Sequence, residues 1–312
     1  MGAVREQQRN SMRFQQSPWK HDARSQRFSH ERFFGSVDVA KLPPSLSRTP
    51  KSPNDQGATL RCAAYAGAKN GEYIYETPMH PDFQTVLVGK VQGRPVDLQG
   101  SDPNSSMKAQ CFDQGGYLPL TDSHITLAKD GPQVSADPAS YSPDNYEEAH
   151  NYGGEGFVRV DGPNDIFDNI RVALFLAYDP IKKRGACVQA FGKWFSEWTY
   201  AVTIPATYAQ FAGYHSFLFV DWVTIDGIAY LLAENSYGSS AGQGGYHYFP
   251  REVVNREFSA WGTSLKILKP LTLDQIALAK QETQLGKIQR AIANAWYALT
   301  LYIIEKYGAI FA

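Results

Sequence analysis

Cys62 is the residue with the clearest chemical potential. It follows a polar, glycine-containing turn and precedes small and aromatic residues at helical spacing, which places its thiol where a loop enters a helix. The partial positive charge at a helix N-terminus lowers the pKa of a thiol and favours the reactive thiolate. Gln56, six residues upstream, is placed to donate a hydrogen bond to an oxyanion beside the sulfur. The alternative is that Cys62 is a small apolar residue in a core helix.

His215 and Asn235 supply a base and a residue to orient it. His215 begins one predicted strand and Asn235 ends the next, with the hairpin signal Asp226-Gly227 between them. Antiparallel strands joined by a short turn bring such ends together. An Asn oxygen that accepts from one ring nitrogen leaves the other nitrogen to face a thiol. Cys, His and Asn thus form the thiol version of a catalytic triad.

Three motifs in this order resemble the papain-like cysteine peptidases. The segment from Asp55 to Ala66 is similar to their Gln-Gly…Cys-Trp-Ala-Phe signature, and Gly213–Ser216 resembles their histidine strand. Ala233–Gly238 with Gly242–Tyr246 resembles Asn-Ser-Trp-Gly…Gly-x-x-Gly-Tyr, and Leu42–Ser45 looks like the segment that opens the mature domain. The chain is identified as a divergent member of phage or bacterial type.

The resemblance implies an α+β fold, in which a helical half carries Cys62 and an antiparallel β half carries His215 and Asn235, with the cleft between them. It also implies a thiolate and imidazolium pair, and an oxyanion hole made by Gln56 and the Cys62 backbone N–H. Peptide bonds in a peptide or protein substrate are hydrolysed through an acyl-enzyme. No cofactor and no metal is expected.

The residues around the nucleophile depart from the family pattern. Thr59 stands where the family has a disulfide-forming cysteine, and Ala63 replaces an aromatic residue. Leu60 and Arg61 are expected to make the cleft near the sulfur narrower and more positive. Tyr237 replaces the Trp that shields the His–Asn contact.

The cleft is expected to be lined by a helix over Ser105 to Gln114 that ends at Gly115-Gly116. The alternative matches Cys111 to Gly116 with the family's Cys-Asn-Gly-Gly segment. Cys111 and Cys187 are predicted to be buried, because three cysteines are too few for a disulfide framework. The full set of predicted cleft residues is Arg61, Ser105, Ser106, Gly115, Gly116, Tyr214 and Tyr237.

Around these residues the sequence predicts a helix from Cys62 to Asn70-Gly71, and loops with short strands over 72–104. His215 and Asn235 follow Cys62 by 153 and 173 residues, beyond the usual spacing of about 130 to 150, which implies an insertion around 119–163. The other predicted elements are a helix over Asp165–Tyr178 and strands over Ala186–Phe191, Thr199–Ile204, Tyr214–Trp222, Ile228–Asn235, Tyr246–Phe249 and Leu265–Leu268.

Three parts of the chain are expected: a basic arm over 1–41, extended or disordered, a peptidase domain over 42–270, and a helical extension over 271–312. The arm and an apolar-striped helix over 273–304 are candidates for contact with a protein partner or for self-association. A net charge of −1 argues against nucleic-acid binding. No apolar run suggests a secretory signal or a membrane span, so the chain is expected in the cytoplasm or packaged in a virion or assembly.

The remaining histidines are expected to be unremarkable. His80, His124 and His150 are predicted to be solvated loop residues without metal-ligand spacing, and His247 a surface residue of a strand. Two functions compete with a peptidase: a structural or virion assembly protein that keeps the fold with weak or no activity, and a hydrolase of peptidoglycan peptides using the same triad.

Overall fold

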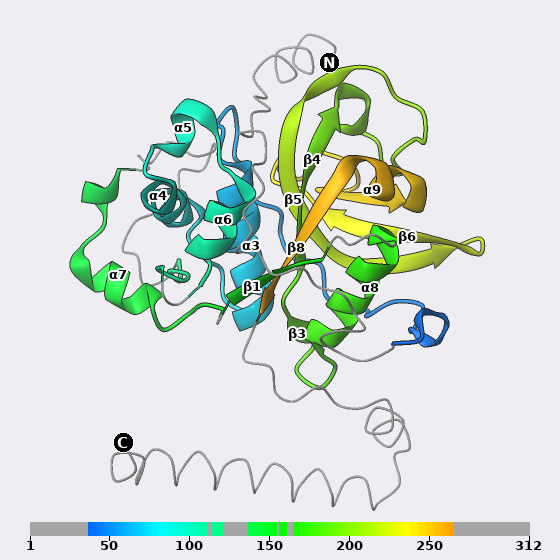
Figure 1. The fold of residues 1–312 in the computed structure, drawn as a ribbon, viewed down its shortest axis with the longest axis horizontal. Coiled ribbons are helices and arrows are strands. Elements are labelled where there is room, and N and C mark those ends of the chain that lie inside the picture. The colour runs from blue at the N-terminus through cyan, green and yellow to red at the C-terminus, as the bar shows by residue number, and fades with distance from the viewer. Residues whose placement is uncertain (1–36, 112–113, 121–136, 155, 161–164, 265–312) are drawn as a thin grey trace, which may run out of the picture. The chain divides into compact units, whose positions relative to one another are not determined.

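The computed structural model describes residues 37–111, 114–120, 137–154, 156–160 and 165–264. In this part a group of helices packs against a six-stranded antiparallel sheet (Figure 1). The predicted α+β fold with a helical half and a β half is confirmed. The predictions for residues 1–36, for His124, for the strand at Leu265–Leu268 and for the helix over 273–304 lie outside the described residues.

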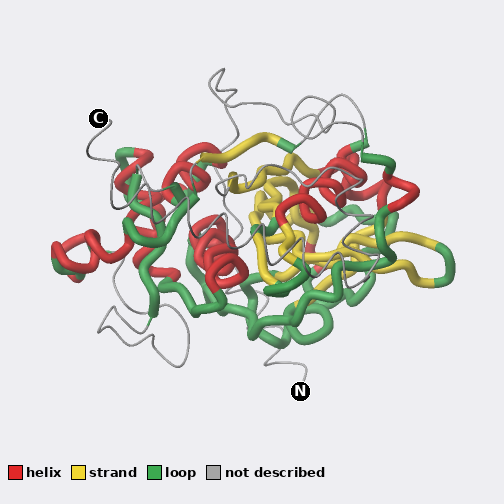
Figure 2. Tube along the Cα trace, turned by 90° about the horizontal axis from the view of Figure 1, so that it is seen from below, coloured by secondary structure: helices red, strands yellow, loops and turns green. Residues whose placement is uncertain are grey.

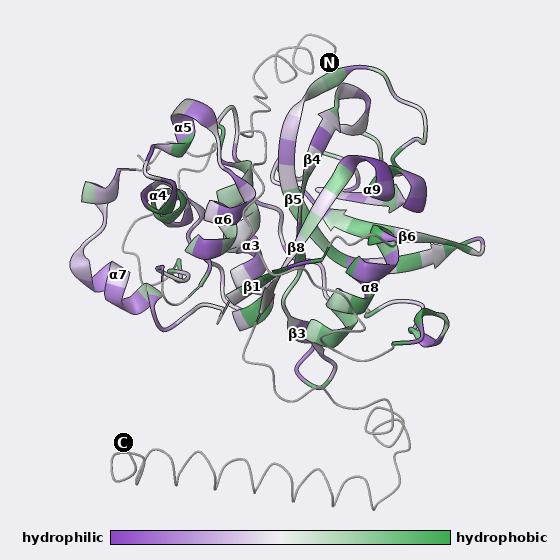
Figure 3. Ribbon diagram, viewed as in Figure 1, coloured by the Kyte–Doolittle hydropathy of each residue, from purple (hydrophilic) through white to green (hydrophobic). Residues whose placement is uncertain are grey.

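The helical half is built around one buried helix, α3. Helix α4 packs against α3 and against α6, and α7 is mainly hydrophilic, with few residues turned inward (Figure 3). The helices of this half are α3 (Cys62–Tyr75), α4 (Pro81–Gln92), α5 (Val96–Gln99), α6 (Pro103–Ala109) and α7 (Pro143–Ala149).

The sheet has the strand order β1-β8-β4-β5-β6-β7, and all its pairs are antiparallel. Its strands are β1 (Gly156–Arg159), β4 (Val188–Phe195), β5 (Phe211–Ile225), β6 (Ile228–Glu234), β7 (Tyr246–Pro250) and β8 (Phe258–Ser264). Beside it are α8 (Ile166–Ala177), α9 (Arg251–Glu257), the short ribbon β2 (Tyr178–Asp179) with β3 (Arg184–Gly185), and the 3-10 turns at Val39–Lys41 and Ser196–Trp198. A further 3-10 turn, Pro138–Ser140, precedes α7 in the helical half.

Helices lie on both sides of the strands (Figure 2), and the two faces of β5 pack against different layers. Phe217 and Phe219 pack into the large core shared with α8 and α9. Leu218 and Val220 alternate with them and pack against α3, because successive side chains of a strand point to opposite faces. The helix that begins at Cys62 is therefore pressed directly against the strand that carries His215.

The prediction that α3 ends at Asn70-Gly71 is wrong, because the helix continues to Tyr75 and ends at Glu76 in the left-handed conformation. Gly71 has another use. A Cβ placed there would lie 2.7 Å from the ring of Tyr117, so glycine permits close packing within the helical half and does not stop the helix.

The prediction of loops and short strands over 72–104 is also wrong, since α4 and α5 occupy this segment. Two end signals mark α4. Pro81 stands in its first turn, and Gly93 ends it at φ 72°, the residue types favoured at those positions. His80 caps the helix by accepting from the Phe83 N–H and is buried, which corrects its assignment as a solvated residue.

Several smaller predictions change as well. Thr199–Ile204 is an irregular segment with a single bridge from Thr203 to Tyr248 rather than a strand. The cleft helix is shorter than predicted and starts earlier, at Pro103, with Asp102 as its cap. Residues 119–163 are predicted to be an insertion, and their described part contains α7 and β1, which pairs with the unpredicted strand β8. Cys111 and Cys187 are buried, as predicted.

Candidate active site

Cys62 is the first residue of α3, as predicted, and is 3% exposed. The backbone N–H groups of Cys62, Ala63 and Ser216 face the sulfur and favour the thiolate. Burial acts against them and dominates, raising the pKa of the Cys62 thiol to about 11. The backbone N–H groups at the start of α3 therefore lower the pKa of the thiol, as predicted. Burial outweighs them, so the thiol is neutral in this arrangement.

His215 lies on β5 with its ring fully buried. Its Nε2 is 2.8 Å from Oδ1 of Asn235, the contact expected between base and orienting residue. Burial lowers the pKa of His215 to about 3, although the bond to Asn235 opposes that shift. The thiol and the imidazole are thus both neutral here, in contrast to the expected ion pair, because burial disfavours both charged forms.

Tyr237 covers the other ring nitrogen of His215. Its ring stacks on the imidazole with centroids 4.6 Å apart and planes 15° apart, and its hydroxyl is 3.0 Å from Nδ1. Burial raises the pKa of Tyr237, as does the nearby Cys62 sulfur in its thiolate form, so the phenol stays protonated and donates to Nδ1. Tyr237 shields the histidine, as predicted for the residue in the Trp position, and is itself buried rather than open to a cleft.

Gln56 is held beside this group by Ser236, the residue after Asn235. Its backbone N–H donates to the Ser236 carbonyl over 2.9 Å, and its Oε1 accepts from the Ser236 hydroxyl over 2.6 Å. The side-chain Nε2 donates to the Thr59 carbonyl over 2.9 Å. An amide nitrogen carries two hydrogens, and the second one is the candidate oxyanion donor.

Arg61 does not add open positive charge next to the sulfur, which corrects that prediction. Its side chain is 6% exposed, forms two hydrogen bonds with Asp97 of 2.8 and 2.6 Å, and donates to Asp82 over 2.8 Å. Tyr65 also donates to Asp82. The guanidinium joins the start of α3 to α4 and α5.

The other predicted cleft residues divide into buried and exposed ones. Ser106 is buried, with its hydroxyl donating to the Ala63 carbonyl over 3.2 Å, and Ser105 is 8% exposed. Gly115 packs on Leu87, and Gly116 packs on the backbone of Tyr152. The two glycines therefore face the interior of the helical half, since Cβ atoms would collide there, and they do not line a cleft. Tyr214 is exposed at the start of β5.

His247 and Trp194 belong to the site, although neither was predicted to. His247 is fully buried rather than on the surface. Its Nε2 is 3.3 Å from Nδ2 of Asn235, and its Nδ1 is 2.8 Å from the Ala201 carbonyl. The Trp194 ring lies edge-on to both His215 and His247, at 4.9 and 5.6 Å. Only the two-residue alternation of β7 could have hinted that His247 points inward.

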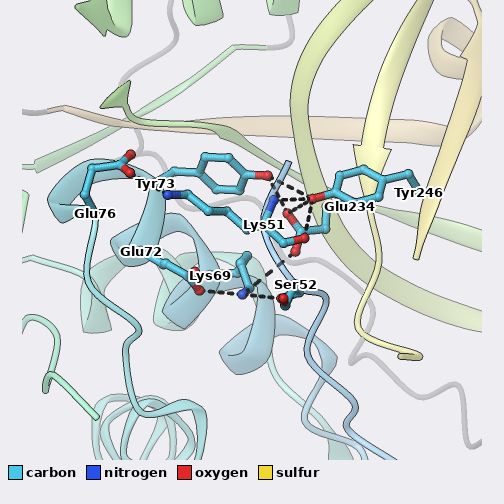
Figure 4. Close-up of polar contacts among 8 residues, drawn as sticks. All are labelled: Lys51, Ser52, Lys69, Glu72, Tyr73, Glu76, Glu234 and Tyr246. Carbon is cyan, nitrogen blue, oxygen red and sulfur yellow. Dashed lines mark hydrogen bonds and ion pairs between the residues drawn. The ribbon is translucent and has the colours of Figure 1, made fainter. Parts of the chain in front are cut away.

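A charged cluster lies on the other side of the β6 end, around Glu234 (Figure 4). Tyr73 and Tyr246 donate to Oε2 of Glu234 over 2.6 and 3.1 Å. Lys69 pairs with Glu72, donates to the Ser52 carbonyl over 2.8 Å, and lies 3.9 Å from Oε1 of Glu234. Burial raises the pKa of Glu234 to about 7, against the effect of Lys69. The cluster joins α3 to the end of β6, at the residue before Asn235.

Among the described residues, no three His, Cys, Asp or Glu side chains are grouped so that they could hold a metal ion. Searching the same residues for a helix with the length and apolar character of a membrane span gives none. The candidate site is assembled from a thiol, two imidazoles, two amides, a phenol and the indole of Trp194.

Comparison with known proteins agrees with this architecture. No protein-family model and no curated protein matches the chain. Among solved structures, xylellain, a cysteine protease from Xylella fastidiosa, is 21% identical, with 82% of this chain and 97% of xylellain covered and a TM-score of 0.64. ProCathepsin B S9 from Trypanosoma congolense is 12% identical, with coverages of 84% and 88% and a TM-score of 0.60.

A third structure, the proform of the ragweed pollen allergen Amb a 11 cysteine protease, is 15% identical, with 79% of this chain and 73% of that chain covered and a TM-score of 0.56. The three neighbours share the architecture of papain-like cysteine proteases. The chain therefore has the papain-like fold, and the resemblance identified from its motifs is confirmed at the level of the fold.

Proposed function

We propose that this chain is a cysteine peptidase in which Cys62 is the nucleophile, His215 the general base and acid, and Asn235 the residue that orients the imidazole. The observation that carries the proposal is the 2.8 Å contact between Nε2 of His215 and Oδ1 of Asn235, within a papain-like fold whose helix α3 begins at Cys62. This contact directs Nδ1 of His215 away from Asn235 and makes it the base.

The reaction starts from a neutral thiol and a neutral imidazole. Nδ1 of His215 takes the thiol proton while the Cys62 sulfur attacks the peptide carbonyl carbon, and the imidazolium then gives that proton to the leaving amine. Water activated by His215 hydrolyses the acyl-enzyme. Gln56 and the Cys62 backbone N–H donate to the oxyanion. Since the Tyr237 hydroxyl occupies Nδ1, it must leave that nitrogen before the proton moves.

An irreversible epoxide probe for thiol peptidases tests the proposal, with cleavage of a fluorogenic peptide library as the second readout. The three thiols are controls for one another because Cys62, Cys111 and Cys187 are all at most 3% exposed. We expect the adduct to map to Cys62, to disappear in His215→Ala, and peptide cleavage to be lost in Cys62→Ser. Equal labelling of Cys111, or labelling that is the same in His215→Ala, would contradict it.

A structural protein that retains the fold is the second candidate function. Two observations favour it: the Tyr237 hydroxyl on Nδ1 of His215, and the thiol pKa of about 11 for Cys62. Under this alternative the native chain and Cys62→Ser behave alike toward every peptide in the library, and the epoxide does not select Cys62. The same two readouts therefore separate the two functions.

A further inference from the structure

We propose that His247 is a positioning residue of this site, which sets the proton of His215 on Nε2 by holding the side-chain amide of Asn235 in one orientation. The expected change in kcat rests on the proposed function. The position of the proton on His215 rests on four groups that are connected by hydrogen bonds. These groups run from Ala201 through His247 and Asn235 to His215.

The series of hydrogen bonds begins at the Ala201 carbonyl, which can only accept. This carbonyl lies 2.8 Å from Nδ1 of His247, so that nitrogen carries a hydrogen. Burial lowers the pKa of His247 to about 4, which makes the ring neutral near pH 7. Its Nε2 therefore has a lone pair and can only accept.

The next two links follow from that lone pair. Nε2 of His247 is an acceptor 3.3 Å from Nδ2 of Asn235, so the NH₂ group of Asn235 must face His247. Oδ1 of Asn235 then faces His215. The Ser236 backbone N–H, 2.7 Å from Oδ1, supports the same orientation. Oδ1 then accepts from Nε2–H of His215, and Nδ1 of His215 is left with the lone pair that a base needs.

Packing fixes the ring of His247 in this role. Trp194 lies edge-on to it, and a Cβ at Gly242 would be 2.8 Å from its Nδ1. Glycine at φ 50° there lets the loop cover the imidazole. The titratable group facing His247 is His215, while Trp194, Gly242 and the Ala201 carbonyl carry no charge.

The test compares His247→Phe, which keeps a ring without an acceptor, with His247→Gln, which restores an acceptor for Asn235. His80→Phe is the control, because His80 is equally buried but caps α4 in the helical half. The tautomers of both histidines are read from the ¹⁵N spectra of histidine-labelled protein, assigned with His215→Ala and His247→Gln. kcat and KM are measured on a cleaved library peptide.

We expect Nδ1–H at His247 and Nε2–H at His215 in the native chain. In His247→Phe the Nδ1–H form of His215 appears, and kcat falls about tenfold with KM within about twofold, since a buried donor loses its acceptor. The kcat of His247→Gln should stay within about threefold of the native value, and His80→Phe should leave the His215 tautomer unchanged.

A proton on Nε2 of native His247, or an unchanged His215 tautomer in His247→Phe, overturns the inference. If no peptide is cleaved, the proposed function fails, but the tautomers still decide this inference. If His247→Phe does not fold, the spectra of the native chain and of His247→Gln decide it.

Discussion

Two polar networks meet at neighbouring residues at the end of β6, and they differ in charge. The network around Asn235 is neutral and consists of two imidazoles, amides and a phenol. The network around Glu234 contains Lys69 and carboxylates as well as two phenols. Neutral hydrogen bonds depend strongly on direction, so the first network can define a tautomer. Charge pairs are less directional, and in a buried place they make stability depend on protonation.

We infer that the neutral network positions groups for the proposed chemistry, whereas the charged network joins the helical half to the β half. We expect changes in the neutral network to alter reaction rates with little change in stability. We expect changes in charged clusters to alter stability and its dependence on pH. Changes at Arg61, Gln56, Glu234 and Tyr237 test this division.

Arg61→Leu should have the largest effect on stability. It leaves the buried carboxylate of Asp82 without the guanidinium that it contacts at 2.8 Å, and breaking such a buried pair typically costs about 3 to 5 kcal/mol. Urea unfolding measures the loss. The double variant with Asp82→Asn removes both charges and should recover more than half of it. A single variant as stable as the native chain would show that the cluster does not join α3 to α4 and α5.

Gln56→Ala should lower kcat about a hundredfold to a thousandfold, because one oxyanion donor is lost, while thermal unfolding shifts little. Steady-state peptide cleavage measures the rate. Ser236→Ala is the matched control, since it removes only the hydroxyl that holds Oε1 of Gln56, and we expect about a tenfold loss. Equal rates for Gln56→Ala and the native chain would exclude Gln56 from the oxyanion site.

Glu234→Gln should flatten the pH dependence of stability. The folded pKa of about 7 lies above the ordinary value of about 4.3, so the folded state binds the proton more tightly than the unfolded state. This contribution is complete below the unfolded pKa and is lost as pH rises through about 7, a change on the order of 3 kcal/mol.

Urea unfolding between about pH 4 and pH 8 compares the native chain with Glu234→Gln. We expect the difference in unfolding free energy to shift in favour of the variant as pH rises. Parallel curves would mean that Glu234 is not protonated in the folded state, and the contrast between the charged and neutral networks would then lose its pH component.

Tyr237→Phe should have the smallest effect. Removing the hydroxyl frees Nδ1 of His215, and one neutral hydrogen bond is worth about 0.5 to 1.5 kcal/mol, so epoxide labelling of Cys62 should become about threefold to tenfold faster. The labelling rate is measured by mass spectrometry of the intact protein. Slower labelling would instead assign the hydroxyl a part in moving the thiol proton.

The positions of Cys62, His215 and Asn235 in the fold could be predicted because their signals are local. Cys62 at a helix start, and His215 and Asn235 on the strands that flank a hairpin, need only patterns within short windows. Helix α4 also had local end signals, Pro81 and Gly93, but its apolar residues read equally well as short strands. The fold class followed from the order of three motifs.

The environment of the site could not be predicted, because its partners are distant in sequence. The residues next to Arg61 in sequence predict an exposed charge. In the structure Arg61 contacts Asp82 and Asp97, which lie 21 and 36 residues further along the chain. His247 reads as a surface residue until Ala201, 46 residues away, supplies the carbonyl over its ring. Burial of the thiol likewise depends on packing of α3 against β5, which no short window reveals.

The pH dependence of Cys62 alkylation by iodoacetamide, in the native chain and in His215→Ala, tests the central claim most directly. If a neutral His215 activates a neutral thiol, the native rate is level from about pH 5 to about pH 9, because the base is already deprotonated. In His215→Ala the rate is lower and rises about tenfold per pH unit toward the thiol pKa of about 11. Superimposable curves for the two proteins would contradict the account.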